Sequence, residues 1–250
     1  MSTYKTTAII IKNRDFGEAD RLLTLYTRDF GKIAAKAIGV RKVTSKLSGH
    51  LDLLNLTEII LAKGRSIDTV IGAVTKKSFL ALKKDLKKVS LAYCFLEFIE
   101  KLTPEKEKHE ELFDLLKVSL SMLEKIGKSN ERELLKAIFE FKLLDELGHR
   151  PVLKNCILCK KEPENGMYFD FEKGGIVCRR CKDANSGAKE ISKDALLVLN
   201  AFEKLEIKDI FKVKGIGKAI EEARSVIKDF NYYIFNKIYK TELFLAATID

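Results

Sequence analysis

The sequence predicts an α+β protein of several domains, with an N-terminal five-stranded barrel, a helical bundle and a zinc-ribbon insertion. Three observations carry this prediction. Short β-rich segments alternate with glycine-containing turns over about the first 75 residues, apolar residues then recur at helical spacing, and two C-x-x-C pairs interrupt the helical region. Of the 250 residues, 46% are hydrophobic and 33% charged, so the chain has enough apolar material for buried cores.

The N-terminal region contains five strand-like segments, each bounded by glycine or polar turn residues. A turn over residues 13–17 separates the first two segments. Short strands leave exposed sheet edges unless the sheet closes, and the five-stranded OB barrel is the common closed form that also binds single-stranded nucleic acid. An SH3-like barrel is the structural alternative. The predicted strands are residues 6–12, 21–27, 32–38, 53–61 and 69–74.

Helical spacing of apolar residues begins near Lys83 and predicts three helices before Gly148, which is placed to end the third. Thr103-Pro104-Glu105 is read as a helix start, because Thr can cap a helix and Pro is tolerated in its first turn. Ser192 is expected to open a further helix, and residues 216–239 to supply one or two more. The apolar stripes of the first three helices cover residues 89–98, 112–123 and 134–147.

The predicted domain boundaries follow these changes of period. Residues 1–80 form the barrel, residues 81–152 and 187–250 the helical domain, and residues 153–186 the zinc-ribbon insertion. No segment approaches the ~18 uncharged apolar residues of a membrane helix, and the N-terminus lacks a signal-peptide core. We therefore expect a cytoplasmic protein.

The four cysteines of the C-x-x-C pairs are Cys156, Cys159, Cys178 and Cys181, and eighteen residues separate the pairs. This spacing is typical of a tetrahedral zinc site, in which a hairpin returns the second pair to the first. Residues 168–171 and Gly174-Gly175 supply the strand and the turn of that hairpin. Four thiolates leave no open position on Zn²⁺, so the ion would be structural. Two local disulfides and a redox dithiol are the alternatives.

Positive charge is concentrated at the N-terminus. Residues 1–80 hold 14 Lys and Arg against 7 Asp and Glu, whereas residues 81–150 hold 14 of each. Such asymmetry favours a polyanionic partner, because Lys and Arg neutralise phosphates and release counterions. Lys outnumbers Arg by 36 to 10, which favours binding without base readout. The candidate DNA contacts are Arg14, Arg21, Lys32, Lys36, Arg41, Lys42 and Lys46, with Tyr26 or Phe16 as candidates for base stacking.

Catalytic motifs are not found, and the sequence predicts no enzyme. Gly127-Lys128-Ser129 resembles the end of a phosphate-binding loop, but Met122 stands where that loop needs a glycine. The three histidines fall in separate segments, and no nucleophile elbow is present. Lys214 to Lys218 is read as a helix-entry loop, with a second DNA contact as the alternative. Arg179 and Arg180 are either solvated or in contact with phosphate.

The chain resembles the RecO family of bacterial recombination mediators over nearly its whole length. The resemblance implies an OB-fold DNA-binding domain, a helical domain and a zinc ribbon. It also implies annealing of complementary strands, work with RecR, and help in loading RecA onto strands covered by single-strand-binding protein, whose acidic C-terminal tail would bind an apolar groove. The resemblance rests on Ala8-Ile9-Ile10-Ile11, Gly17 to Thr27, Gly31-Lys32, Lys36 to Lys42, Ser45-Lys46 and the four cysteines between helical segments.

Two other classes of function remain open from the residues alone. The first is a protein–protein adaptor, in which the ribbon and helices bind proteins and the barrel is only structural. The second is a hydrolase or transferase. A salt titration separates the first from a DNA-binding protein, because binding through phosphate contacts weakens steeply with salt.

Overall fold

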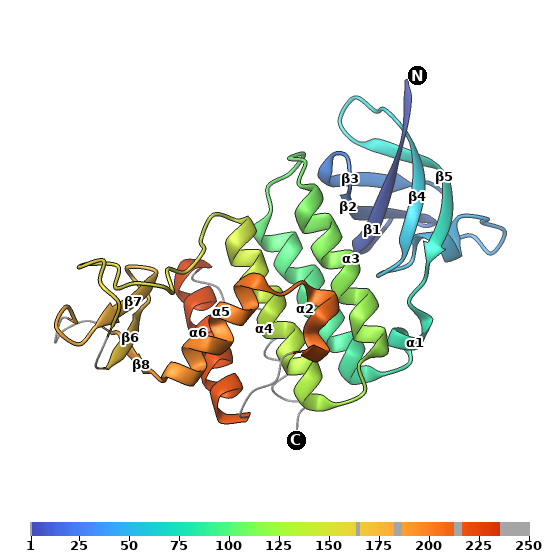
Figure 1. The fold of residues 1–250 in the computed structure, drawn as a ribbon. Helices are drawn as coiled ribbons and strands as arrows, with labels where there is room; N and C mark the ends of the chain where they lie inside the picture. The colour runs from blue at the N-terminus through green and yellow to red at the C-terminus, as the bar shows by residue number, and fades with distance from the viewer. Residues whose placement is uncertain (1, 164–165, 183–186, 213–216, 236–250) are drawn as a thin grey trace. The chain divides into compact units, whose positions relative to one another are not determined.

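The computed structural model describes residues 2–163, 166–182, 187–212 and 217–235 (Figure 1). These residues form two compact units, the first ending at Lys125 and the second beginning at Ile126. This division lies inside the segment 81–152, which the sequence pattern assigns to the helical domain. The boundaries of the three predicted domains stay predictions. No described helix is both long enough and apolar enough to cross a bilayer.

Five strands of the first unit close into a barrel with the order β1-β2-β3-β5-β4, as the sequence predicts for this region. All neighbouring strands are antiparallel except β3 and β5, which pair in parallel. The expected turn over residues 13–17 is wrong, because β1 continues to Phe16 and pairs with β2 along that length. The strands are β1 Thr3–Phe16, β2 Asp20–Thr27, β3 Gly31–Ala37, β4 Leu56–Ala62 and β5 Asp68–Lys77.

The barrel interior is filled by alternate residues of these strands, such as Leu23 and Leu25 of β2. Between Ile10 and Lys12 of β1 the register shifts by one residue, because Ile10 pairs with Leu25 and Lys12 with Thr24. This bulge turns Lys12 and the next alternate residues of β1 toward the outer face of the barrel. Lys12 can therefore follow the buried apolar residues of β1 without its side chain entering the core.

Three helices and one 3₁₀ turn complete the described part of the first unit: η1 Ser48–Leu51, α1 Leu80–Lys83, α2 Leu86–Leu102 and α3 Glu110–Lys125. Asp85 caps α2, since its carboxylate accepts from the N–H groups of Lys87 and Lys88. The predicted helix start at Thr103 is wrong. Thr103 is the C-terminal cap of α2, and its hydroxyl donates to the carbonyl of Ile99. Cys94 is fully buried in α2.

The second unit combines three helices with a small sheet of order β7-β6-β8. The ring of Phe169 on β6 lies 5.2 Å from that of Phe230 on α6, so the sheet is buried against this helix. Gly148, with φ +82°, follows the C-cap of α4, and the hydroxyl of Ser192 caps α5, as predicted. The elements are α4 Ser129–Glu146, β6 Met167–Asp170, β7 Gly175–Cys178, β8 Lys189–Ile191, α5 Lys193–Lys204, η2 Ile207–Lys212 and α6 Gly217–Phe235.

Candidate metal centre and candidate nucleic-acid interface

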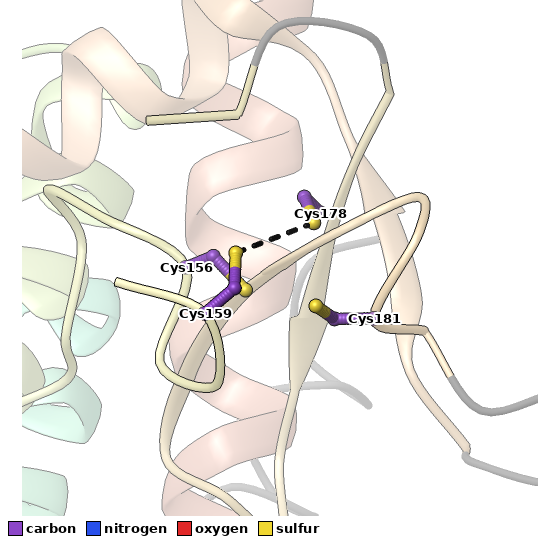
Figure 2. A group of neighbouring side chains, drawn as sticks. All are labelled: Cys156, Cys159, Cys178 and Cys181. Atoms are coloured by element: carbon purple, nitrogen blue, oxygen red, sulfur yellow. Dashed lines mark hydrogen bonds between the residues drawn. The ribbon is translucent and has the colours of Figure 1, made fainter. Parts of the chain in front are cut away.

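The four cysteines predicted as metal ligands lie together in the second unit (Figure 2). Their sulfur atoms are all within 4.8 Å of one another, and all four thiols are free of disulfides. The Sγ atoms of Cys159 and Cys178 are 3.9 Å apart. A disulfide would need about 2.05 Å, whereas two thiolates on a tetrahedral Zn²⁺ with Zn–S bonds of about 2.3 Å are separated by about 3.8 Å. The arrangement is compatible with a zinc site.

Each C-x-x-C pair sits on a tight turn that aims both sulfurs inward. In the first turn the N–H of Lys160 donates to the carbonyl of Cys156 at 2.8 Å, and Lys160 has φ +61°. In the second, the N–H groups of Cys181 and Lys182 both donate to the carbonyl of Cys178 at 3.0 Å. The predicted hairpin joins them, because β6 pairs with β7 and Gly174 turns between them with φ +70°. The local spacing therefore dictates the geometry of the cluster.

The pKa values of two thiols of the cluster, Cys156 and Cys181, are shifted. Burial opposes ionisation of Cys156, but N–H groups of Cys159, Cys178 and Leu158 point at its sulfur and lower its pKa to about 6. The protonated thiol of Cys181 donates hydrogen bonds to the sulfur atoms of Cys178 and Cys159, and these bonds, together with burial, raise the pKa of Cys181 to about 12. Four thiolates at this separation repel one another, so they need a cation to be ionised together.

Two of the predicted DNA-binding arginines meet at the end of the barrel where β1 turns into β2. Arg21 and Arg41 both place Nε near the carboxylate of Asp15, at 3.1 and 3.3 Å. Arg41 also donates to the carbonyls of Gly17 and Glu18 in the turn itself. Arg41 thus fastens the loop after β3 to the β1–β2 turn, and both arginines remain partly exposed.

Lys36 lies beside the same turn, on the outer face of β3. Its Nζ is 2.9 Å from the carboxylate of Asp20 and 4.9 Å from the centroid of the half-exposed ring of Phe16. A hydrogen bond from the N–H of Gly39 lowers the pKa of Asp20 most, with Lys36 adding a hydrogen bond and its charge, and Lys42 its charge. The structure therefore brings Arg21, Lys36 and Arg41 to one end of the barrel, with Lys42 near enough to influence Asp20.

Arg14, Lys42 and Lys46 are exposed, and none has an ion-pair partner among the residues that the structure describes. Arg14 pairs with Leu22 on the outer face of β1 and β2, next to the strand that carries Lys36. We call Arg14, Arg21, Lys36, Arg41, Lys42 and Lys46 the barrel lip. The sequence alone does not predict that the carboxylates of Asp15 and Asp20 lie inside this lip. The cations that pair with them lie on other strands and on the loop after β3.

Lys32 does not belong to the lip. Only 9% of this residue is exposed, and its ammonium donates to the carbonyls of Glu100 and Thr103 at 2.6 and 2.5 Å. The expectation that Lys32 faces DNA beside Lys36 does not fit this placement, because α2 occupies that end of the strand. Tyr26 is likewise 1% exposed and its ring lies 6.4 Å from that of Phe113, so it is not available to stack on a base. The predicted helix-entry loop at Lys214 to Lys218 falls largely outside the described residues.

The closed barrel, the helices that follow it and the four-cysteine module define an α+β protein of the class that joins a small β barrel to a helical region. The family described as Recombination protein O N terminal matches residues 1–79, and Recombination protein O C terminal matches residues 83–235. The chain therefore belongs to the RecO family of DNA repair proteins, which confirms the resemblance seen in the sequence.

Individual relatives cover almost the entire chain. The DNA repair protein RecO of Dehalococcoides mccartyi is 36% identical over 245 residues, 98% of this chain and 95% of the relative. That of Pelotomaculum thermopropionicum is 32% identical over 98% of this chain and 94% of its own length. That of Acetivibrio thermocellus is 30% identical over 100% of this chain and 98% of its own length.

Proposed function

We propose that this protein binds single- and double-stranded DNA through the barrel lip and anneals complementary strands. We further propose that it helps RecR to load RecA onto DNA covered by single-strand-binding protein. The RecO relatives are named DNA repair proteins, which supports the general role. The observation that carries the DNA contact is the placement of Arg21, Lys36 and Arg41 at one end of a small closed barrel. Arg14, Lys42 and Lys46 are exposed and have no ion-pair partner among the described residues.

The barrel itself supports an OB-type assignment. In it β1 pairs with both β2 and β4, and β3 closes the barrel against β5 in parallel. Barrels of this type bind single strands along the face of their second and third strands and through adjoining loops. The lip lies on β1, β2 and β3 and on the loop that follows β3. Arg21 and Lys36 lie on the second and third strands, where such binding is expected.

Annealing by this surface needs no catalytic residue, and we propose none. Cations that neutralise phosphates reduce the repulsion between two strands, while base pairing supplies the specificity. The rise in rate would come from higher local concentration of the strands. A protein acting in this way would associate with the nucleoid, where the chromosomal DNA is.

The cysteine cluster is proposed to hold one structural Zn²⁺. All four thiolates would be ligands, which leaves no position for water or substrate. The energy of metal binding would then stabilise the fold of the hairpin that contains β6 and β7. We propose that the helical elements bind RecR and the acidic tail of single-strand-binding protein, with RecA engaged indirectly.

The triple variant R14Q/K42Q/K46Q tests the DNA contact. These three side chains are exposed and bonded to no described residue, so their removal should leave the fold intact. At ~0.1 M salt we expect binding of an oligonucleotide to weaken by about an order of magnitude, and the slope of log affinity against log salt to fall by about 2. The matched control K84Q/K87Q/K101Q removes the same charge from exposed positions on or beside α1 and α2, and should bind as the wild type does. Equal binding by the two variants would show that the lip is misplaced.

The alternative function is a protein–protein adaptor without direct DNA binding. The same titration decides between the two proposals. If the wild-type protein binds no oligonucleotide at low salt, the adaptor is favoured and the barrel is a structural domain.

A further inference from the structure

A second basic surface lies in the other compact unit, on the two turns that carry the cysteines. Residues 156–161 and 178–182, which we call the knuckles, contain five cations and no carboxylate. These are Lys160, Lys161, Arg179, Arg180 and Lys182. If Zn²⁺ is bound by four thiolates, the cluster carries a charge of −2, which leaves the knuckles at +3 (five minus two). The knuckles are therefore cationic whether or not the metal is present, and the exposed carboxylate of Glu162 follows Lys161 directly.

Four of these cations are directed to solvent. Lys160, Lys161, Arg179 and Arg180 are exposed, and none has an ion pair or hydrogen-bonded side-chain partner among the described residues. The fifth, Lys182, holds its Nζ 4.3 Å from the ring centroid of Tyr168. Arg150 and Arg224 of the same unit, in contrast, each bind a carboxylate.

The cysteine cluster holds the four exposed cations close together. Each lies within two residues of a cysteine, and the sulfur atoms of those cysteines are within 4.8 Å of one another. With ~3.8 Å between successive Cα atoms, Lys160 and Lys161 on one turn, and Arg179 and Arg180 on the other, have chain positions well within a Debye length at ~0.1 M salt, so the fields of each pair add. The positions on the two turns lie within about two Debye lengths of each other. The hydrogen bonds of the two turns fix the backbone that carries them.

The chemistry of this surface fits a phosphate backbone better than a protein. Arg forms paired hydrogen bonds with phosphate, and adjacent cations follow a strand without reading its bases. A protein interface needs an apolar centre, but Leu158 is the one exposed large hydrophobic residue on the described knuckles.

We propose that the knuckles bind a second nucleic-acid strand, independently of the barrel lip. This inference rests on the proposed annealing function and makes it more specific. One chain would hold one strand on each compact unit, so complementary strands would not compete for a single surface. The cysteine cluster would then serve as the rigid base of a binding site as well as a structural element.

The variant R179Q/R180Q tests the second site. The probe is oligo(dT) of about 15 nucleotides, the length that one OB barrel covers. The wild-type protein should saturate with two strands per chain and the variant with one, and the variant should anneal complementary oligonucleotides several-fold more slowly. The matched control K128Q/K193Q removes two charges from exposed positions at the starts of α4 and α5 and should retain both strands.

Three further measurements separate the explanations. R179K/R180K keeps the charge and should restore the second strand. If R179Q/R180Q and R179K/R180K both contain less zinc than the wild type, the arginines serve the metal site, and the proposal is overturned. If R179Q/R180Q no longer binds a polyglutamate peptide but binds oligo(dT) as the wild type does, the knuckles bind a protein partner instead.

The two proposals can also fail separately. At oligonucleotide concentrations too low to fill the weakened barrel lip, R14Q/K42Q/K46Q should bind one strand, held by the knuckles. If that variant binds two strands while R179Q/R180Q binds one, the barrel lip is wrong and the knuckle site stands. A wild-type protein that saturates with a single strand, or an R179Q/R180Q variant that saturates and anneals as its control does, overturns the knuckle site.

Discussion

The ammonium of Lys32 donates a hydrogen bond of 2.5 Å to the carbonyl oxygen of Thr103, 71 residues further along the chain. The carbonyl of Glu100 accepts a second bond from the same group at 2.6 Å. A cation at the C-terminal end of a helix interacts favourably with the helix dipole and satisfies carbonyls that have no partner within the helix. A lysine from the barrel therefore caps α2 and joins the helix to β3.

Replacing Lys32 with Met tests this role, because Met keeps the apolar stem and removes the ammonium. The buried bond to Thr103 and the partly buried bond to Glu100 both lose their charged donor, so we expect the free energy of unfolding to fall by about 2 to 3 kcal/mol in urea titrations. Lys101→Met is the control, since Lys101 is exposed in the last turn of the same helix. It should change stability by less than about 0.5 kcal/mol. An unaltered midpoint for K32M, with weaker DNA binding, would return Lys32 to the DNA surface.

The sequence predicts the parts of this protein whose determinants are local. The period of the apolar residues locates β1 to β5 and the helices, and the C-x-x-C spacing locates the cysteine cluster. It misplaces Lys32 because alternation along β3 assigns a face but does not say what covers that face. The helix that covers it begins more than fifty residues later, at Leu86.

The turn predicted at residues 13–17 fails for a related reason. Asn13, Arg14 and Asp15 are polar and follow an apolar run, which is a common sign of a turn. In the structure they extend β1 and pair with Arg21 to Leu23 of β2. Only the pairing between strands shows that the polar residues are still part of the sheet, and that Asp15 faces two arginines.

Tyr26 gives a prediction about stability. Its side chain is buried and its hydroxyl has no hydrogen-bond partner among the described residues. Burial, with the charge of Glu107 nearby, raises the pKa of the phenol. Tyr26→Phe removes a polar atom that burial disfavours, so the variant should be as stable as the wild type or more stable by up to about 1 kcal/mol. Tyr168→Phe, which keeps the ring beneath Lys182, is a suitable comparison. A loss above 1 kcal/mol would mean that the Tyr26 hydroxyl is bonded.

Tyr4 predicts how stability responds to alkaline pH. Burial and a hydrogen bond donated to the carboxylate of Asp68 raise its pKa. The folded state then keeps its proton at a pH where the unfolded state, with a pKa near 10, has released it. The contribution is complete below about pH 10 and decreases as the pH rises above that value. Urea titrations between pH 8 and 11 should show a smaller loss of stability for Tyr4→Phe than for the wild type. Parallel curves would contradict this assignment.

The cysteine cluster predicts a metal dependence. Reductively purified protein should contain one zinc per chain by atomic absorption, and a chelator should lower the midpoint of thermal unfolding. Acidification should release the metal, because protons compete for the thiolates. C156S/C159S should lose the zinc, whereas Cys94→Ala should keep it, since Cys94 lies in α2 of the first unit and is not one of the four clustered cysteines. A disulfide-bonded protein without metal would contradict the proposed zinc site.

Asp20 gives the most direct test of the charge balance at the barrel lip. Its carboxylate holds the ammonium of Lys36 and accepts a hydrogen bond from the N–H of Gly39, and these contacts lower its pKa. The carboxylate therefore stays ionised throughout the pH range of a binding assay and opposes any phosphate at the lip.

Asp20→Asn keeps an oxygen that can accept from Gly39 but removes the charge, so the loop after β3 should hold its shape while Lys36 is released. We expect oligonucleotide binding to tighten by about threefold at low salt, and the gain to disappear as salt screens the lip. Glu105→Gln is the control, because Glu105 is exposed in the loop after α2, outside the lip. Its backbone forms an isolated β-bridge with Lys32 of β3. Equal tightening in both variants would show that net charge alone governs binding. Weaker binding by D20N would show that the ion pair with Lys36 orders the DNA-binding surface.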